Sequence, residues 1–250
     1  MNRIRRRVAE LQIALMFMTR LPPGPIRGEV PSLADARWAY PLAGLVVGGL
    51  AWCGHALALA AGLPPSVAAV SAIAIMALAT GGLHFDGLAD LADGIGGGRD
   101  AEHRLRIMRD SHIGSYGALA LLLVTALIGA SIASFPPGRA MAGAFLFSAV
   151  TSRLAMLAVL EWLPPVRADG LGRDASGHNP CVLLPGLGIC AGTAWLAGSG
   201  SVPALLSAAV TVFAIAHLAR RKIGGQTGDV LGAIQLATEA ACWLTLATRS

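Results

Sequence analysis

Charge is scarce in this sequence. Its 250 residues include 19 Lys or Arg and 14 Asp or Glu, so that 13% of the chain is charged. This is about half of the roughly 25% that is usual in soluble globular proteins. Hydrophobic residues make up 55% of the chain. These proportions exclude a soluble enzyme with a solvated surface, and they also exclude a disordered chain.

Cysteines and aromatic residues are few as well. The four cysteines, Cys53, Cys181, Cys190 and Cys242, lie in or beside apolar segments. Their spacing is that of neither a zinc site nor a secreted disulfide framework, so we interpret them as small buried hydrophobic residues. No basic patch with interleaved aromatic residues and no DNA-binding motif is present, so we expect no nucleic-acid partner.

What the sequence has instead is long segments without charge. Segments 38–85, 175–219 and 111–138 hold 48, 45 and 28 residues without Asp, Glu, Lys or Arg. Because one helix needs about 20 apolar residues to cross a membrane, the first two segments are long enough for two spans each and the third for one. Proline and glycine turns mark where they divide. The spans are expected near residues 40–62, 66–85, 114–134, 140–162, 181–197, 203–219 and 230–248.

The expected fold is therefore an all-α, polytopic membrane helical bundle with about seven spans. We expect residues 1–250 to form a single integral membrane domain. The apolar segment 8–19 is too short to cross, and it is interpreted as an interfacial or re-entrant helix.

The basic residues predict the orientation of this bundle. With the N-terminus in the cytoplasm and seven spans, 16 of the 19 Lys and Arg residues fall on the cytoplasmic side. Only Arg139 and Arg249 fall on the other side, and Arg153 lies within a span. Such an excess is typical of cytoplasmic loops. We therefore expect a multi-pass protein of the cell inner membrane whose C-terminus faces outward, with lipid as a partner.

Three aspartates stand out against the low overall charge. Segment 80–98 reads TGGLHFDGLADLADGIGGG and places Asp86, Asp90 and Asp93 at spacings i, i+4 and i+7, which puts them on one face of a helix. Three neighbouring carboxylates with no interleaved cation repel one another. A divalent cation relieves this repulsion, and oxygen ligands favour Mg²⁺ or Mn²⁺. His84 adjoins the cluster and is expected to contact the ligand or to order a carboxylate.

Two further motifs fall on the same predicted side. Segment 104–117, RLRIMRDSHIGSYG, predicts an amphipathic surface helix that ends at Arg109 and Asp110. The guanidinium group of Arg109 is suited to clamp phosphate. Segment 220–233, RRKIGGQTGDVLGA, leads from basic residues into a glycine-rich turn at the start of the last span. Backbone amides of such a turn make an anion site. The candidate substrate-binding residues of this segment are Gly224, Gly225, Gln226, Thr227 and Asp229, and Asp229 is the expected helix cap.

Two charged residues fall inside predicted spans. Arg153 and Glu239 are costly in lipid and are expected to face the interior of the bundle. The acidic cluster, the nearby arginines and the glycine-rich turn together favour metal-assisted transfer of a phosphate-linked group. Composition and spacing do not name a substrate.

The three motifs also resemble those of a known family. Segments 81–94 (GGLHFDGLADLADG), 107–117 (IMRDSHIGSYG) and 224–233 (GGQTGDVLGA) are similar to the motif set of cobalamin (5′-phosphate) synthases, also called adenosylcobinamide-GDP ribazoletransferases. Shorter matches at 19–22 (TRLP) and at Ser152-Arg153 extend the resemblance over essentially the whole chain. His112 and Ser115 depart from the family pattern.

The resemblance implies a substrate, a cofactor and residue roles. It implies that a hydroxyl of α-ribazole, or of its 5′-phosphate, attacks the phosphorus of adenosylcobinamide-GDP, with GMP leaving and Mg²⁺ assisting. By position, Asp86, Asp90 and Asp93 correspond to the metal and diphosphate carboxylates. Asp110 and Asp229 complete the acidic site, and Arg109 and Arg153 lie near phosphate. Asp86 or Asp90 is the candidate base, and the sequence leaves a homo-oligomer open.

Two other functions remain as alternatives from the residues. A CDP-alcohol phosphotransferase also uses spaced aspartates on a membrane helix, but the Ala-Arg pair expected after Ala89-Asp90 is missing. An ion-coupled transporter predicts acidic residues at mid-bilayer. Here most acidic residues cluster at one face, and only Glu239 and Arg153 fit a transporter.

Overall fold

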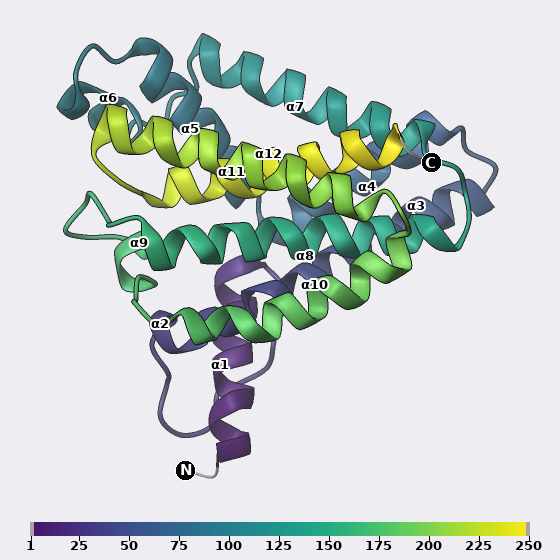
Figure 1. Ribbon diagram of the computed structural model, residues 1–250, viewed down its shortest axis with the longest axis horizontal. Helices are drawn as coiled ribbons and strands as arrows, with labels where there is room; N and C mark the ends of the chain where they lie inside the picture. The colour runs from purple at the N-terminus through teal and green to yellow at the C-terminus, as the bar shows by residue number, and fades with distance from the viewer. Residues whose placement is uncertain (1–2, 249–250) are drawn as a thin grey trace.

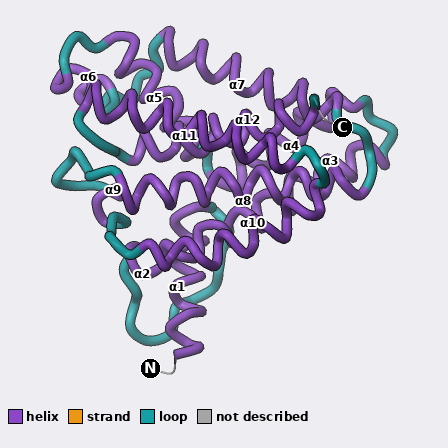
Figure 2. The backbone as a smooth tube through the Cα atoms, viewed as in Figure 1, coloured by secondary structure: helices purple, strands orange, loops and turns teal. Residues whose placement is uncertain are grey.

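The computed structural model describes residues 3–248, and within this range helices provide the regular structure and no strand is formed (Figure 2). The bundle is shown in Figure 1. The α-helices are α1 (Arg3–Met18), α2 (Leu33–Ala36), α3 (Tyr40–Ala60), α4 (Pro65–Thr80), α5 (Leu83–Gly97), α6 (Ala101–Ile107), α7 (Ser115–Ser134), α8 (Arg139–Trp162), α9 (Leu171–Asp174), α10 (Leu183–Ala197), α11 (Ser201–Ile223) and α12 (Gly228–Ala247). Two short 3₁₀ helices, Arg37–Ala39 and Pro180–Val182, precede α3 and α10.

The helix lengths confirm the predicted all-α membrane bundle. In the described part of the chain, 6 helices are long and apolar enough to cross a membrane, and the bent pair α4 and α5 makes up to 7. Helices α8 and α12 are mostly buried and form the centre of the bundle, whereas α7, α10 and α11 expose most of their apolar surface. This exposed apolar surface is what a lipid environment requires.

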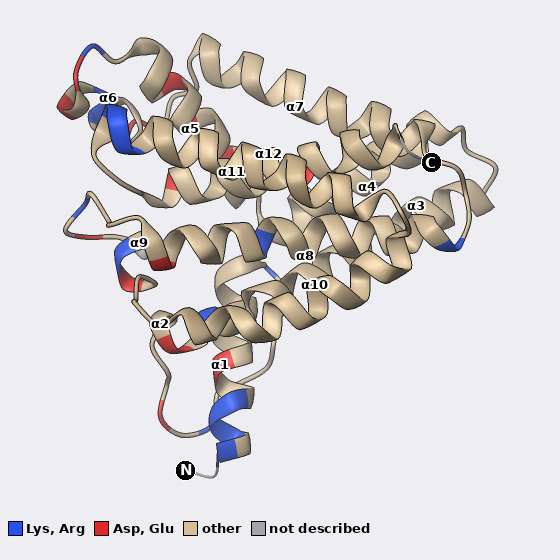
Figure 3. Ribbon diagram, in the orientation of Figure 1, with Lys and Arg blue, Asp and Glu red and all other residues tan. Residues whose placement is uncertain are grey.

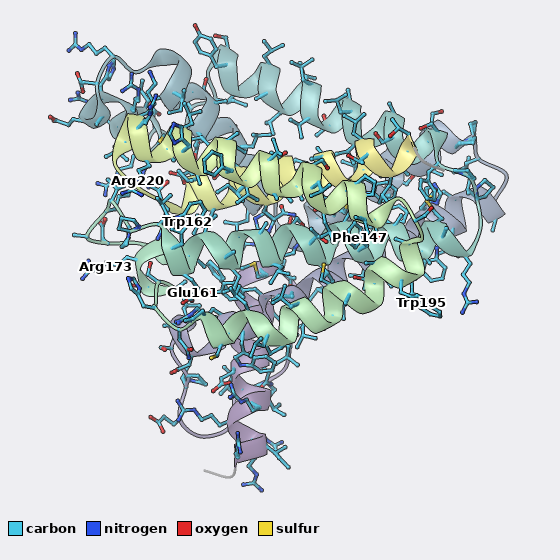
Figure 4. The ribbon with its side chains drawn as sticks, viewed as in Figure 1. Phe147, Glu161, Trp162, Arg173, Trp195 and Arg220 are labelled. Carbon is cyan, nitrogen blue, oxygen red and sulfur yellow. The ribbon has the colours of Figure 1, made fainter. Side chains whose placement is uncertain are left out.

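Charged side chains gather at one end of the bundle (Figure 3). Lys, Arg, Asp and Glu are concentrated on α1, α2, α6 and α9 and on neighbouring helix ends, while the spans are almost free of them. Figure 4 shows Glu161, Trp162, Arg173 and Arg220 toward this end, and Phe147 and Trp195 toward the other. The structure therefore has the one-sided charge distribution from which the orientation was predicted. Arg249, predicted on the opposite side, lies outside the described residues.

Helix α1 begins five residues earlier than the predicted segment 8–19. Its basic first turns are held by Glu10, which is 3% exposed and accepts hydrogen bonds from Arg6 (3.2 Å), Arg7 (2.7 Å) and the Trp38 indole (2.7 Å). In Figure 1, α1 runs across the direction of the long helices. This arrangement favours an interfacial helix over a re-entrant one.

The predicted span 66–85 is wrong at its C-terminal end. Helix α4 stops at Thr80, and the chain bends by 91° before α5 begins. Two consecutive glycines with left-handed backbone, Gly81 (φ +64°) and Gly82 (φ +74°), form the bend, a conformation that glycine adopts without strain. Helix α5, with its three aspartates, therefore does not continue the direction of α4, and it is not among the 6 helices of the described chain that are long and apolar enough to span by themselves.

Glycines set how closely the helices approach. A Cβ atom at Gly44 of α3 would lie 2.6 Å from the carbonyl oxygen of Ala149 in α8. A Cβ atom at Gly87 of α5 would lie 2.9 Å from the carbonyl oxygen of Asp229 and 3.1 Å from the Cα atom of Gly232, both in α12. Small residues at such crossings let the backbones come together, as is common between membrane helices. The Gly87 crossing places α5 directly against the start of α12.

Replacing Gly87 by alanine should therefore destabilise the bundle. The new methyl group would meet backbone atoms that cannot rotate away, and overpacking of this kind costs about 1–3 kcal/mol. Gly49→Ala is the matched control, because a Cβ atom at Gly49 of α3 meets nothing within 4 Å. Thermal unfolding of the purified protein in detergent should show a lower Tm for Gly87→Ala only. An equal Tm for the two variants would contradict the proposed close crossing.

Candidate active site

The crossing of α5 and α12 gathers carboxylates from both helices. Asp86, Asp90 and Asp93 share α5, as the spacing predicted. Asp229 lies in the first turn of α12, and its charge acts on both Asp86 and Asp90. The glycine at position 87 makes this possible, because any side chain there would separate the two helices.

The environment of Asp90 shows that negative charge is in excess here. Burial, followed by the charges of Asp86, Asp229 and Asp93, raises the pKa of Asp90 to about 7, while Arg167 acts in the opposite direction. Neighbouring carboxylates disfavour one another's ionised forms unless a cation lies among them. Asp86, Asp93 and Asp229 therefore all lie close enough to act on Asp90.

Asp93 contacts the start of α7, and the metal role predicted for it stays a prediction. It is 8% exposed, and its two oxygens accept hydrogen bonds from the backbone N–H groups of Gly114 (2.7 Å) and Gly117 (2.9 Å). These amides lie at the N-terminus of α7, where a carboxylate is favourable for the helix dipole. Asp93 thus positions α7. In residues 3–248 no group of three His, Cys, Asp or Glu side chains is arranged to hold a metal ion.

Two cavities adjoin the carboxylates and share Asp86. The first, about 300 Å³, lies between α1, α5, α8, α12 and the segment after α8, and we call it the α8-side cavity. The second, about 490 Å³, lies between α5, α7 and the loop before α7, and we call it the α7-side cavity. Asp229 lines the first and Asp90 the second, while Asp86 lines both. Asp86 is therefore where molecules in the two cavities would meet.

Basic groups reach the site from the segment that follows α8. Arg167 forms an ion pair with Asp229 (3.2 Å), and Arg173 lines the α8-side cavity with Asp169. None of these three residues belongs to a motif that predicted the site. The available signal was that a short charged segment joins two spans at the same end of the bundle as the aspartates.

The glycine-rich segment before α12 packs against the same connection. The backbone N–H of Gln226 donates to the Pro164 carbonyl (2.9 Å), and the Gln226 carbonyl accepts from Val166 N–H (3.0 Å). A Cβ atom at Gly225 would lie 2.2 Å from the Pro164 oxygen, so this pairing requires glycine. The segment therefore holds the Arg167 loop in place.

The amides of this segment form less of an anion site than predicted. The amides of Gly224 and Gln226 donate to protein carbonyls. Thr227 caps α12 by accepting from Val230 N–H (3.3 Å), so the prediction that Asp229 is the cap is wrong. Thr227 and Asp229 line the α8-side cavity instead. The Thr227 hydroxyl therefore caps the helix, and the Asp229 carboxylate two residues later lines the cavity.

Arg109 and Asp110, two predicted site residues, have separate partners. The amphipathic helix predicted over 104–117 is α6, which ends at Ile107. Arg109 pairs with Asp169 at the rim of the α8-side cavity (3.0 Å). Asp110 contacts His112 (2.6 Å) on the surface, and hydrogen bonds from His112 lower its pKa. The structure therefore brings Arg109 near the site and leaves Asp110 outside the carboxylate cluster.

The charges predicted to face the bundle interior do so. Arg153 of α8 and Glu239 of α12 are each 1% exposed and form an ion pair (3.0 Å). Ser152 and Gln235 complete this network. The Ser152 hydroxyl accepts from Arg153 and donates to Glu239, and the Gln235 amide donates to both Ser152 and Glu239. Mutual pairing satisfies both charges within the apolar bundle. The phosphate contact predicted for Arg153 stays a prediction.

His84, predicted beside the cluster, is fully enclosed. It is 2% exposed and lines the α8-side cavity. Neither of its ring nitrogens has a hydrogen-bond partner.

A polytopic bundle with carboxylates and arginines around two cavities at one end is an integral membrane protein with a candidate active site. The chain belongs to the cobalamin-5-phosphate synthase family, whose sequence model matches residues 10–247. The resemblance predicted from the three motifs is thereby confirmed.

Individual relatives agree with this assignment. A protein of Bradyrhizobium diazoefficiens named adenosylcobinamide-GDP ribazoletransferase is 38% identical, over 98% of this chain and 95% of its own length. Proteins of the same name from Azorhizobium caulinodans and a Sinorhizobium species are 41% and 43% identical, over 94% and 90% of this chain and 93% and 90% of their own lengths. No solved structure matches the chain.

Proposed function

We propose that this enzyme transfers the adenosylcobinamide phosphate group of adenosylcobinamide-GDP to α-ribazole or its 5′-phosphate, releasing GMP. The observation that carries the proposal is the family match over residues 10–247, together with the name that the relatives share. The shared carboxylate between two cavities supports a reaction of two substrates.

The transfer exchanges one phosphorus–oxygen bond for another. A ribose hydroxyl oxygen of the acceptor bonds to the phosphorus attached to cobinamide. The bond from that phosphorus to the bridging oxygen of the diphosphate breaks, and GMP leaves with the bridging oxygen. The hydroxyl proton passes to a carboxylate. Asp86 is our candidate base, because it is the carboxylate that lines both cavities, and Asp90 is the alternative.

We further propose that Mg²⁺ assists the reaction. Asp86, Asp90 and Asp229 offer only oxygen ligands and carry excess negative charge, which fits a hard divalent cation. Mg²⁺ is commonly held by one or two carboxylates together with substrate phosphates, so a complete protein cage is not required. When bound, the ion would neutralise charge on the diphosphate. On the other side of Asp86, Arg167 and Arg173 line the α8-side cavity and Arg109 pairs with Asp169 there, so these guanidinium groups would hold a phosphate group of a molecule in that cavity.

The same charges support a location. The basic end of the bundle is the end that carries the carboxylates (Figure 3). Because Lys and Arg favour the cytoplasmic side of a membrane protein, we propose an inner-membrane enzyme whose site faces the cytoplasm.

The direct test is GMP formation. Purified protein in detergent, given adenosylcobinamide-GDP, α-ribazole and Mg²⁺, should release GMP and form the cobalamin product. Treatment with EDTA should abolish this release, and added Mg²⁺ should restore it, because the carboxylates lose the cation that neutralises the diphosphate. Absence of GMP, with CMP released from a CDP-alcohol instead, would replace the proposal by a CDP-alcohol phosphotransferase. Full activity in EDTA would overturn the proposed role of Mg²⁺.

A further inference from the structure

The α8-side cavity has one apolar wall and one charged wall. Phe17 and Met18 of α1 and Met156 and Leu160 of α8 form the apolar wall. The charged wall holds the carboxylates and arginines described above. A molecule that fills this cavity must therefore be apolar on one side and polar on the other.

Buried polar atoms without partners point to a ligand in the same cavity. Both ring nitrogens of His84 and the Oε1 atom of Gln226 are buried and lack a hydrogen-bond partner. Both residues line the cavity, and they are 2% and 0% exposed. Buried polar groups are nearly always satisfied in native proteins, so such atoms indicate where a bound molecule supplies the missing partner.

The size of the cavity separates the two substrates of the proposed reaction. A volume of about 300 Å³ lies at the lower end of the range for small-molecule sites. It suits one nucleoside, whereas a corrinoid macrocycle with its peripheral amides is several times larger. The acceptor is thus the substrate that fits.

The apolar wall also favours one kind of base. The base of ribazole is a dimethylbenzimidazole, a bicyclic ring with methyl groups, no exocyclic N–H or C=O group and a single imine nitrogen that accepts a hydrogen bond. Guanine carries several donors and acceptors, and burial of these groups against methionine, leucine and phenylalanine would leave them unpaired at a substantial cost. An imidazole ring has at least one N–H donor in either protonation state.

We propose, on the basis of the function proposed above, that the α8-side cavity is the binding site of the acceptor nucleoside. The base packs against Phe17, Met18, Met156 and Leu160, and His84 donates to its imine nitrogen. The ribose lies toward Asp86. Arg167 and Arg173 are placed to bind a 5′-phosphate where the acceptor carries one.

This assignment gives helix α1 a role in specificity. Its last turn supplies Phe17 and Met18, and its end is fixed to α4 by the hydrogen bond from Arg20 N–H to the Ala79 carbonyl (2.7 Å). The donor diphosphate then approaches from the α7-side cavity, which Arg20 and Asp90 line. Acceptor hydroxyl and donor phosphorus meet at Asp86, and such positioning of two reactants is itself a large part of catalysis.

The test determines KM for each of the two substrates in steady-state assays and measures α-ribazole binding by equilibrium dialysis. His84→Phe removes the hydrogen bond and Met156→Trp fills the cavity. Each should raise KM for α-ribazole about tenfold or more and weaken its binding to the same extent, with KM for adenosylcobinamide-GDP within about twofold of wild type. His84→Gln, which restores an N–H donor, should recover much of the affinity.

Met16→Trp is the matched control, because Met16 lies on α1 and is 54% exposed; it should change neither KM. The inference is overturned if His84→Phe and Met156→Trp keep the wild-type KM and affinity for α-ribazole, or if guanosine competes with α-ribazole for binding. Wild-type protein that binds α-ribazole in this manner but releases no GMP would overturn the proposed function alone. Wild-type protein that releases GMP while both variants bind normally would overturn the cavity assignment alone.

Discussion

Replacing Asp86 or Asp90 by asparagine is expected to lower kcat by roughly 10²–10⁴-fold without loss of the fold. Asparagine keeps the shape of the side chain and removes the charge that would hold the cation and accept the hydroxyl proton. The two carboxylates also repel each other and Asp229, so their neutralisation should not lower stability. Asp86→Asn should have the larger effect, because Asp86 lines both cavities.

GMP release at saturating substrates and Mg²⁺ measures this effect. Glu102→Gln is the control: it also removes one carboxylate, but on the exposed surface of α6 at the same end of the molecule. It should retain wild-type activity. Full activity in both aspartate variants would eliminate the α5 carboxylates from the reaction.

Breaking the buried pair of Arg153 and Glu239 should produce the largest change in stability. Arg153→Met or Glu239→Leu alone leaves one charge unpaired among apolar helices, and such a loss costs about 3–5 kcal/mol. The double variant removes both charges and should recover most of this stability, because an apolar pair of similar volume packs without desolvation cost.

Thermal unfolding in detergent tests this pair, and activity separates two roles of Arg153. If Arg153 serves packing alone, the double variant should regain both its Tm and its GMP release. If Arg153 also contacts phosphate, as the family resemblance implies, the double variant should regain its Tm and remain inactive. A double variant no more stable than either single variant would contradict the energetic account of the pair.

The number and approximate position of the spans followed from local composition. Long segments without charge are costly to expose and suited to lipid, and this property depends on neighbours in the sequence only. The end of α4 was misplaced for the same reason. Residues 81–85 are apolar enough to extend a span, and only the backbone conformation of Gly81 and Gly82 shows that the chain turns there.

The site was predictable in part. The regular spacing of Asp86 and Asp90 on one helix was visible because a helix converts spacing directly into a shared face. Asp93 falls on the same helix face, yet its carboxylate accepts hydrogen bonds from the amides of Gly114 and Gly117. Arg167 had no periodic signal, since it lies in an irregular segment and is placed through the pairing of 164–166 with Gln226.

The sequence by itself determined the class of protein, its membrane bundle and its family, because hydropathy and motif order are properties of the linear chain. Only the tertiary structure decided which carboxylates share a cavity. It also decided that Asp93 contacts the start of α7 and that Arg167 pairs with Asp229. These contacts join residues that are far apart in sequence, at crossings such as Gly87 with Gly232, where the absence of side chains lets two helices meet.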